Sequence, residues 1–573
     1  MTKKLITGAE LLIQYLEKKG VDIIFGYPGG AAIPIFDALV DSKIKLVLVR
    51  HEQGAAHIAD GYARATGKPG VVLVTSGPGA TNTVTGIITA MMDSVPMIVL
   101  CGQTITTSLG KDAFQEADVF GITAPIVKHS YLVKNPVDIP RIVEESFYIC
   151  STGRPGPVVI DLPKDITGAM TPIQDSPPVM DIPGYTFPTH ARSKDIQKIA
   201  NYIKQSHRPL ILAGQGALIS EAYNEIQELA ETIQAPVVNT LLGKGVFPEN
   251  HPLSLGMLGM HGTAYANKAL TRCDLILSIG SRWDDRITPG KIERFCPDAV
   301  KLHIDIDPAE INKIVVPDAS AVGDAKLVLR DLIPLLGKLN TKEWLKEVDQ
   351  YRRKFPLNYK KTGGLKAQHV IDELYKLTKG DAIVTTDVGQ HQMWAAQFFK
   401  SHFSRSWISS GGAGTMGFGF PAAIGAQFGC SKKTVIAIVG DGGFQMTAFE
   451  LSTAMLHKLP IKIVVIDNKF LGMVRQWQQL FYDDRLSGVN LEGNPDFVKL
   501  AEAYGVKGFR IKRAADVRKI LSRALAYSDG PCLIHAEVIK EDNVFPMIPA
   551  GGAAEDMLIE APKVKMEKPK GST

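Results

Sequence analysis

The chain has 573 residues, of which 45% are hydrophobic and 21% are charged, so it can bury several cores and has a length typical of about three or four domains. Its formal net charge of +5 is spread over 64 basic and 59 acidic residues, and no charged block favours nucleic acid or a membrane surface as a partner. Six widely spaced cysteines without a CxxC pair suggest neither a zinc site nor a disulfide framework, which fits a cytoplasmic protein.

The first 165 residues are expected to form a doubly wound parallel sheet. Thr7-Gly8-Ala9-Glu10 is a capping box that predicts a helix near the first residue, so we expect no signal peptide. Apolar runs that predict strands follow at residues 21–25, 45–49, 71–75, 96–101 and 157–161, with helical patterns between them. No apolar run approaches the roughly 20 residues that span a bilayer.

Two further α/β units are expected after a proline-bearing linker at residues 166–190. The central unit, 191–340, has predicted strands at 209–213, 275–279 and 300–306, the first of which runs into a glycine turn. A charged stretch at 341–363 is expected to link it to the third unit, 364–550, which a tail at 551–573 follows. The predicted fold is therefore three doubly wound parallel-sheet domains.

Polar oxygen ligands follow two neighbouring apolar runs of the third unit. The run at 434–440 ends at Asp441, and the run at 463–467 ends at Asn468. Because the carboxyl ends of parallel strands meet at one edge of a sheet, we expect these side chains to lie close together. A single Asp between glycines is usually an ordinary turn. Two such strand ends instead favour a hard divalent cation, Mg²⁺, that also holds a diphosphate.

Three other stretches each have a structural and a functional interpretation. Glu52 follows the predicted strand at 45–49, where it could simply complement a helix dipole or could act as a carboxylic acid in a site. The glycine-rich turn at 75–82 could hold an anion or allow close packing of a helix on a strand. Met416 lies among the glycines of 409–419, where it could fill a core or form a wedge against a ligand.

The spacing of the two oxygen ligands resembles the thiamine diphosphate fingerprint, in which Gly-Asp-Gly is followed by an Asn pair. Here Asp467 replaces the first Asn, and the ligand position Asn468 is kept. Many further segments, in order along nearly the whole chain, resemble the catalytic subunit of the acetohydroxyacid synthase family, also called acetolactate synthase. These segments are 25–30, 50–53, 75–82, 112–116, 153–157, 162–165, 258–263, 282–286, 414–417 and 471–478.

The resemblance implies three cofactors, namely thiamine diphosphate, Mg²⁺ and FAD, the last with a structural role. It implies that Glu52 hydrogen-bonds the aminopyrimidine, so that its imino form removes the C2 proton. The other residues that match this cofactor and its metal are Gln390, His391, Gly414, Met416, Asp441, Gly442, Gly443, Asn468 and the carbonyl of Phe470. The residues that match the FAD site are Arg154, Gly214, Gly216, Met260, His261, Arg282, Asp285, Asp305 and Asp324. Two departures lie nearby, Trp283 in place of the usual Phe and Pro289 in the following turn.

The implied reaction decarboxylates pyruvate and condenses the hydroxyethyl carbanion with a second 2-keto acid, as the first common step of valine, leucine and isoleucine biosynthesis. Pyruvate as acceptor gives 2-acetolactate, and 2-ketobutyrate gives 2-aceto-2-hydroxybutyrate. The residues that match the substrate channel are Phe114, Gln115 and Lys164. The residues that match the acceptor pocket are Arg286, Met473 and Trp477.

The resemblance also implies partners. Glu52 and the metal motif lie in different domains, which in this family meet across two chains, so a homodimer or homotetramer is expected, together with a small regulatory subunit. Three alternatives remain: an oxidase of the pyruvate oxidase type that uses FAD for electron transfer, a cofactor-binding regulatory protein without catalysis, and a catabolic acetolactate synthase without FAD. The segments at 282–286 and 473–478 argue against the oxidase, the presence of Glu52 and Asn468 argues against the regulatory protein, and the FAD-site matches argue against the third.

Overall fold

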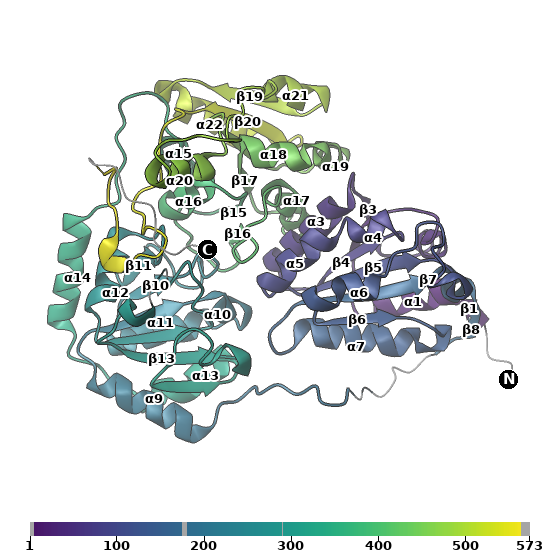
Figure 1. The fold of residues 1–573 in the computed structure, drawn as a ribbon, viewed down its shortest axis with the longest axis horizontal. Coiled ribbons are helices and arrows are strands. Elements are labelled where there is room, and N and C mark those ends of the chain that lie inside the picture. The colour runs from purple at the N-terminus through teal and green to yellow at the C-terminus, as the bar shows by residue number, and fades with distance from the viewer. Residues whose placement is uncertain (1–4, 175–179, 181, 289, 291, 563–573) are drawn as a thin grey trace.

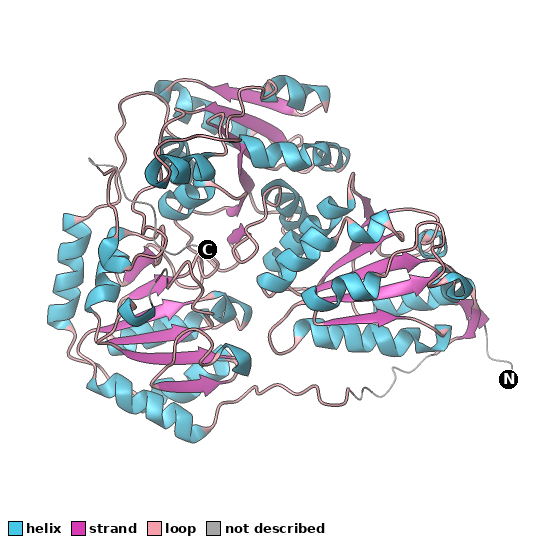
Figure 2. Cartoon of the chain, viewed as in Figure 1, coloured by secondary structure: helices cyan, strands magenta, loops and turns pink. Residues whose placement is uncertain are grey.

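The fold consists of three parallel sheets with helices on both faces, one sheet in each domain, which confirms the predicted fold class (Figures 1 and 2). The computed structural model describes residues 5–174, 180, 182–288, 290 and 292–562. Part of the first expected linker, the position of Pro289 and the lysine-rich end of the expected tail lie outside the described residues. In Figure 1 the N-terminal domain is purple, the central domain teal, and the C-terminal domain green to yellow.

The N-terminal sheet has the strand order β3-β2-β4-β5-β7-β6. Its strands are β2 (Ile23–Tyr27), β3 (Lys45–Leu48), β4 (Gly70–Val74), β5 (Met97–Gln103), β6 (His129–Leu132) and β7 (Pro157–Pro163), and β1 (Leu5–Thr7) pairs with β8 (Met170–Pro172) outside it. Its helices are α1 (Gly8–Lys18), α2 (Ile33–Ala38), α3 (Glu52–Thr66), α4 (Pro78–Thr81), α5 (Val84–Met92), α6 (Val119–Thr123), α7 (Ile139–Ser151) and α8 (Lys164–Gly168). The predicted capping box is confirmed, because the Thr7 hydroxyl accepts the N–H of Glu10 at 3.1 Å and the Glu10 carboxylate accepts the N–H of Thr7 at 2.6 Å.

The central sheet has the order β11-β10-β9-β12-β13-β14. Its strands are β9 (Pro209–Ala213), β10 (Val237–Asn239), β11 (Ser254–Met257), β12 (Leu275–Ile279), β13 (Val300–Asp305) and β14 (Ala319–Val322). Its helices are α9 (Ser193–Gln205), α10 (Gln215–Ile219), α11 (Tyr223–Ile233), α12 (Ala264–Arg272), α13 (Ala325–Leu332) and α14 (Lys342–Lys354). Helix α14 lies within the segment expected to be a linker, and it buries Trp344 and Val348 against this domain.

The C-terminal sheet has the order β16-β15-β17-β18-β20-β19. Its strands are β15 (Ile383–Thr386), β16 (Trp407–Ser409), β17 (Val435–Gly440), β18 (Lys462–Asp467), β19 (Lys507–Ile511) and β20 (Cys532–Glu537). Its helices are α15 (Ala367–Thr378), α16 (Gln390–Phe398), α17 (Gly419–Gly429), α18 (Asp441–Thr447), α19 (Leu451–Leu456), α20 (Gly472–Phe481), α21 (Phe497–Ala503) and α22 (Val517–Ala526). The central strands β17 and β18 are fully buried, because helices cover both faces.

The N- and C-terminal domains of the chain share one apolar core where α3 packs on α17 (Figure 1). A Cβ on Gly61 of α3 would lie 2.1 Å from the carbonyl oxygen of Ala422 on α17. Glycine therefore allows a backbone approach at this crossing that no other residue permits. Within the described part of the chain, no helix is long and apolar enough to cross a membrane.

Candidate functional site

A cavity of about 1230 Å³ lies where the central and C-terminal domains meet. Its walls include the turns that follow β9, β12 and β13 of the central sheet and the turns that follow β15 to β18 of the C-terminal sheet. Ligands of α/β proteins commonly bind at the carboxyl ends of parallel strands, and here the carboxyl ends of two sheets line the same cavity. The N-terminal domain contributes Met92, Ser94 and residues 151–155, and Phe187, which precedes α9, also lines the cavity.

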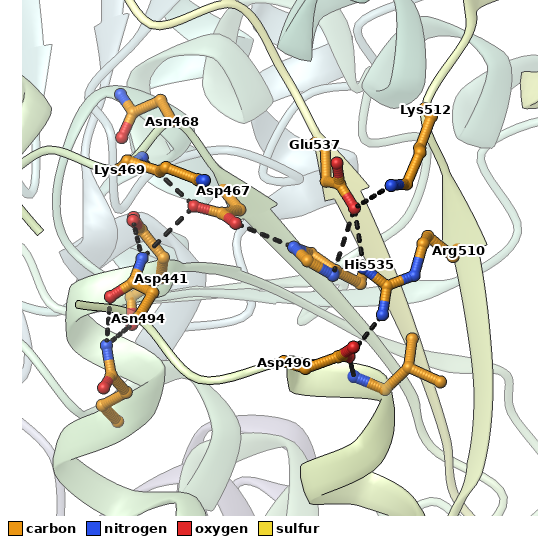
Figure 3. Close-up of polar contacts among 12 residues, drawn as sticks. Asp441, Asp467, Asn468, Lys469, Asn494, Asp496, Arg510, Lys512, His535 and Glu537 are labelled. Carbon is orange, nitrogen blue, oxygen red and sulfur yellow. Dashed lines mark hydrogen bonds and ion pairs between the residues drawn. The ribbon is translucent and has the colours of Figure 1, made fainter. Parts of the chain in front are cut away.

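Three oxygen ligands in this cavity suit a hard cation. Asp441 is the first residue of α18, directly after β17, and Asn468 follows the neighbouring strand β18 (Figure 3). Both side chains are buried, and Phe470, whose carbonyl is the third expected ligand, lines the same cavity. Among the described residues no group of three His, Cys, Asp or Glu side chains could hold a metal ion, so this site relies on one carboxylate and neutral oxygens. Such a set is typical of Mg²⁺ bound together with a phosphate ligand.

Asp441 belongs to a polar network with Asn494, Asp467 and His535 (Figure 3). Asn494 donates to Asp441 Oδ2 at 2.7 Å and to Asp467 Oδ1 at 3.3 Å, and His535 Nε2 lies 2.8 Å from Asp467 Oδ2. Burial, and then the charge of Asp467, raises the pKa of Asp441 to about 8. The pKa of Asp467 is lowered. Burial alone would raise it, but the hydrogen bonds with His535 and Asp441 outweigh burial. Two carboxylates this close need a positive charge, which a proton or a divalent cation supplies.

The residues expected to contact a diphosphate lie beside the metal ligands. Gln390 begins α16 after β15, and its Oε1 accepts from Asn468 Nδ2 at 3.1 Å. His391 is buried with Nε2 unpaired among the described residues, and burial lowers its pKa to about 3, so it stays neutral. A Cβ on Gly440 would lie 2.7 Å from the His391 ring, and a Cβ on Gly442 would lie 2.9 Å from Leu471. Because Gly440 and Gly442 have no side chains, the backbone at these positions can approach His391 and Leu471 closely.

The loop with the expected wedge residue is fixed by Asp387, which sequence reasoning missed. Asp387 follows β15 and is buried, and its carboxylate accepts the N–H groups of Gly417 at 3.0 Å and Gly419 at 3.0 Å. Burial raises its pKa to about 6. Met416, one residue before the first of these contacts, lines the cavity, as does Gly414 with a φ of +60°. Asp387 stands at a strand's carboxyl end, so the rule that identified Asp441 would also have found it.

The central half of the cavity contains most of the residues expected at a flavin site. Those that line it are Arg154, Gly216, Met260, His261, Arg282, Asp285, Asp305 and Asp324. Gly214 is not among the lining residues described, and it instead packs on Gly280, whose carbonyl oxygen a Cβ would approach to 2.1 Å. Arg154 donates to Glu310 at 2.6 Å and to Ser94 at 2.8 Å. Trp283 is buried and stacks edge-on against Phe295 and His303.

The residues expected to bind the acceptor line the same cavity. They are Arg286, Met473 and Trp477. The Arg286 guanidinium donates to the sulfur of Met260 at 3.3 Å and carries a positive charge into the cavity. Trp477 lies on α20 and stacks against Phe481 at 5.6 Å between ring centroids. A cation beside an aromatic wall can bind a small carboxylate with an apolar tail.

A separate group of expected site residues lies on the N-terminal domain. Glu52 begins α3, and Asn82 donates to its Oε2 at 3.0 Å. Gln115, with a φ of +57°, packs against Gly77, whose Cβ would lie 2.8 Å from the Gln115 carbonyl oxygen. Phe114 is 89% exposed, and Lys164 begins α8 after β7. Among the described residues, Glu52, Phe114, Gln115 and Lys164 do not line the cavity, so within one chain the expected residues are divided between the cavity and the N-terminal domain.

The cavity residues fit the expected cofactors. The fit depends on the oxygen ligands Asp441 and Asn468, on the unpaired His391 nitrogen, and on Gly440 and Gly442 beside it. A second unpaired imidazole nitrogen among the described residues is Nδ1 of the buried His261, which lines the cavity and is one of the residues expected at the flavin site. Both groups need a partner that can hydrogen-bond inside a buried space.

Comparison with known proteins gives matches along the whole chain. Family models match it in order as the thiamine pyrophosphate enzyme N-terminal TPP binding domain at residues 6–122, the central domain at 196–332 and the C-terminal TPP binding domain at 387–536. The probable acetolactate synthase large subunit of Methanocaldococcus jannaschii is 49% identical over 557 residues, which cover 95% of this chain and 94% of that protein. The acetolactate synthase large subunits of Porphyra purpurea and Haemophilus influenzae are 48% and 44% identical, covering 96% and 98% of this chain and 95% and 99% of their own.

Proposed function

The chain belongs to the thiamine pyrophosphate enzyme family and, within it, to the acetolactate synthase large subunits, and from this premise we propose its reaction. It decarboxylates pyruvate with thiamine diphosphate and joins the two-carbon unit to pyruvate or 2-ketobutyrate, as in branched-chain amino acid biosynthesis. The observation that carries this proposal is that the metal ligands Asp441 and Asn468 share one cavity with Arg286 and Trp477. Cofactor and acceptor are thereby held side by side, as a condensation requires.

We propose that Asp441, Asn468 and the Phe470 carbonyl hold Mg²⁺, and that the central half of the cavity holds FAD in a structural role. When bound, thiamine diphosphate would supply a nucleophilic C2 carbon for the keto group and a cationic thiazolium ring that can accept the electron pair released with CO₂. His391 and Gln390 would contact its diphosphate, and Met416 would pack against it as a wedge. These assignments agree with the positions of the residues around one cavity.

The remaining roles concern protons and substrate. Glu52 would hydrogen-bond the ring nitrogen of the aminopyrimidine and exchange a proton with it, which would allow the amino group to lose or gain a proton. The Gly414 carbonyl would accept a hydrogen bond from that amino group. Arg286 pairs with the carboxylate of the acceptor through parallel hydrogen bonds. Trp477 offers an apolar surface to the acceptor, where the extra methylene of 2-ketobutyrate gains about 1–3 kcal/mol.

The active enzyme is a homodimer or a dimer of dimers in which each Glu52 serves the cavity of the other chain. This assembly explains why Glu52, Gln115 and Lys164 lie apart from the cavity of their own chain. A smaller regulatory subunit is a further partner, because the three relatives described above are named large subunits.

The test is product analysis of the purified protein with pyruvate, thiamine diphosphate, Mg²⁺ and FAD, with and without 2-ketobutyrate, while flavin absorbance is monitored. The synthase gives acetolactate and acetohydroxybutyrate, and the flavin stays oxidised. Acetate or acetyl phosphate with bleaching of the flavin would instead show an oxidase, and the roles of Arg286 and Trp477 would be wrong.

A further inference from the structure

We infer that Glu450 is a positioning residue for Glu52, because its carboxylate fixes the backbone from which the helix carrying Glu52 starts. Glu450 belongs to the C-terminal domain and ends η7 (Ala448–Glu450), whereas Glu52 is the first residue of α3 in the N-terminal domain. The inference rests on the proposed role of Glu52 in proton transfer.

The contacts of Glu450 converge on the two residues before Glu52. Its Oε1 accepts the N–H of Arg50 at 3.0 Å and the N–H of His51 at 3.2 Å. Its Oε2 accepts the hydroxyl of Thr453 at 2.6 Å. Glu450 is 0% exposed. A buried carboxylate with three donors has a strongly preferred orientation, because each lost hydrogen bond would leave a polar group unpaired.

The surroundings of this contact allow little movement. A Cβ on Gly54, in the first turn of α3, would lie 2.2 Å from Glu450 Oε1, so the carboxylate lies directly against the helix backbone. The ring of Phe449 lies 5.7 Å from the ring of His51. The His51 side chain in turn caps α3 by accepting the N–H of Gln53 at 3.1 Å. The start of α3 is therefore held from two sides, by its own cap and by the C-terminal domain.

Glu450 also connects Glu52 to the metal site of its own chain. The helical segment α18 begins at Asp441 and continues directly into η7, which ends at Glu450. In the proposed dimer, Asp441 belongs to one active site and Glu52 to the other. One short segment thus carries both the expected metal ligand of one site and the residue that positions Glu52 of the second.

The experiment compares Glu450→Ala and Glu450→Gln with the wild-type full chain. The matched control is Asp274→Ala, because Asp274 also accepts two consecutive backbone N–H groups, those of His207 at 2.8 Å and Arg208 at 2.9 Å, as well as a serine hydroxyl, but in the central domain. Three quantities are measured: amide hydrogen exchange at Arg50 and His51 without cofactor, the affinity for thiamine diphosphate with Mg²⁺, and the exchange rate of the cofactor's C2 proton.

We expect Glu450→Ala to expose the amides of Arg50 and His51 to faster exchange and to slow C2 exchange by about 100-fold, the scale on which misplaced groups cost rate. Cofactor affinity should change by less than roughly threefold, well under the tenfold that corresponds to 1.4 kcal/mol. Glu450→Gln keeps an acceptor for the two N–H groups and should restore most of the C2 exchange. The Asp274→Ala control should leave both exchange measurements as in the wild type.

C2 exchange in Glu450→Ala within about twofold of the wild type would overturn the inference, since a twofold change is under 0.5 kcal/mol. Equal losses in the Ala and Gln variants would also overturn it, because the carboxylate charge and not its position would then matter. Should Glu450→Ala not fold, Thr453→Val releases the same carboxylate and should show the same effects more weakly. An unchanged C2 exchange in Glu52→Gln would overturn the proposed role of Glu52 itself, whereas loss in Glu52→Gln without loss in Glu450→Ala overturns this inference alone.

Discussion

The carbonyl oxygen of Ile58 on α3 lies 1.8 Å from the point where a Cβ on Gly425 of α17 would stand. The two helices therefore cross with backbone against backbone, and the shared core of the N- and C-terminal domains is built around that crossing.

Replacing Gly425 by Ala should destabilise the protein by at least about 1–3 kcal/mol, because overpacking a rigid crossing forces the backbones apart. Thermal unfolding would show the loss. Gly337→Ala is the matched control, since no atom lies within 4 Å of its Cβ position. Equal melting temperatures for the two variants would contradict the described packing.

Glu52→Gln should lower turnover by about 10²–10⁴-fold, the usual contribution of a positioned acid or base. Thiamine diphosphate affinity should hardly change, because Asn82 and the surrounding backbone keep the side chain in place. Steady-state kinetics and cofactor titration separate the two effects. Near wild-type turnover would remove Glu52 from the mechanism.

Asp441→Ala should weaken Mg²⁺-dependent cofactor binding by more than about 100-fold, since substitutions of groups behind a metal ligand already cost 10–100-fold. Titration of the apo protein with Mg²⁺ and thiamine diphosphate measures this loss. Asp381→Asn, which breaks the exposed ion pair with Lys433 at 2.7 Å, should bind as the wild type does. Unchanged Mg²⁺ dependence in Asp441→Ala would refute the metal site.

Asp387→Ala should weaken thiamine diphosphate binding by about 10-fold or more, because the N–H groups of Gly417 and Gly419 lose their acceptor and the loop with Met416 loosens. Asp387→Asn keeps one acceptor oxygen and should lose less. An affinity equal to the wild type in both variants would show that this loop is held by other contacts.

Asp161 should make stability depend on pH. Burial raises its pKa from 3.8 to about 7, so the folded protein binds a proton that the unfolded chain releases above about pH 4. The stabilisation is complete below the unfolded pKa and is lost as the pH rises to about 7. Asp161→Asn has no carboxyl to titrate at this position, so it does not lose this stabilisation. As the pH rises from about 4 to about 7, its denaturant midpoint should therefore increase relative to that of the wild type. A pH-independent difference would contradict the buried carboxyl.

The central strands could be predicted because they are buried on both faces and therefore consist of unbroken apolar runs. The strand β12 is an example, and it begins and ends where it was expected. The missed strands include the inner strands β10 and β20, and also β6, β11, β14, β16 and β19, which stand at the edges of their sheets. Edge strands have one solvent-facing side and a mixed composition, as in the Lys-Gly-Phe-Arg-Ile sequence of β19, so periodicity does not reveal them.

The site likewise contains residues that a local sequence pattern reveals and residues that it does not. The placement of Asp441 and Asn468 in one cavity could be predicted because each directly follows a strand that the sequence reveals. Glu450 could not, because its contacts with Arg50 and His51 join residues about 400 positions apart. Asn494 gives no local signal either, since it reaches Asp441 from a loop between two other elements. Local patterns identify groups at strand ends, whereas the groups that orient them are determined by tertiary packing.

The separation of Glu52 from the Asp441 cavity within one chain has a consequence for mixtures of damaged chains. A Glu52→Gln chain keeps its metal site, and an Asp441→Ala chain keeps its glutamate, so each preparation is inactive alone. In the proposed dimer, a hybrid of the two chains would bring the intact metal site of the first to the intact glutamate of the second and would have one working site. Random reassociation of equal amounts would make about half of the dimers hybrids, so about a quarter of all sites would regain function by complementation between two inactive proteins.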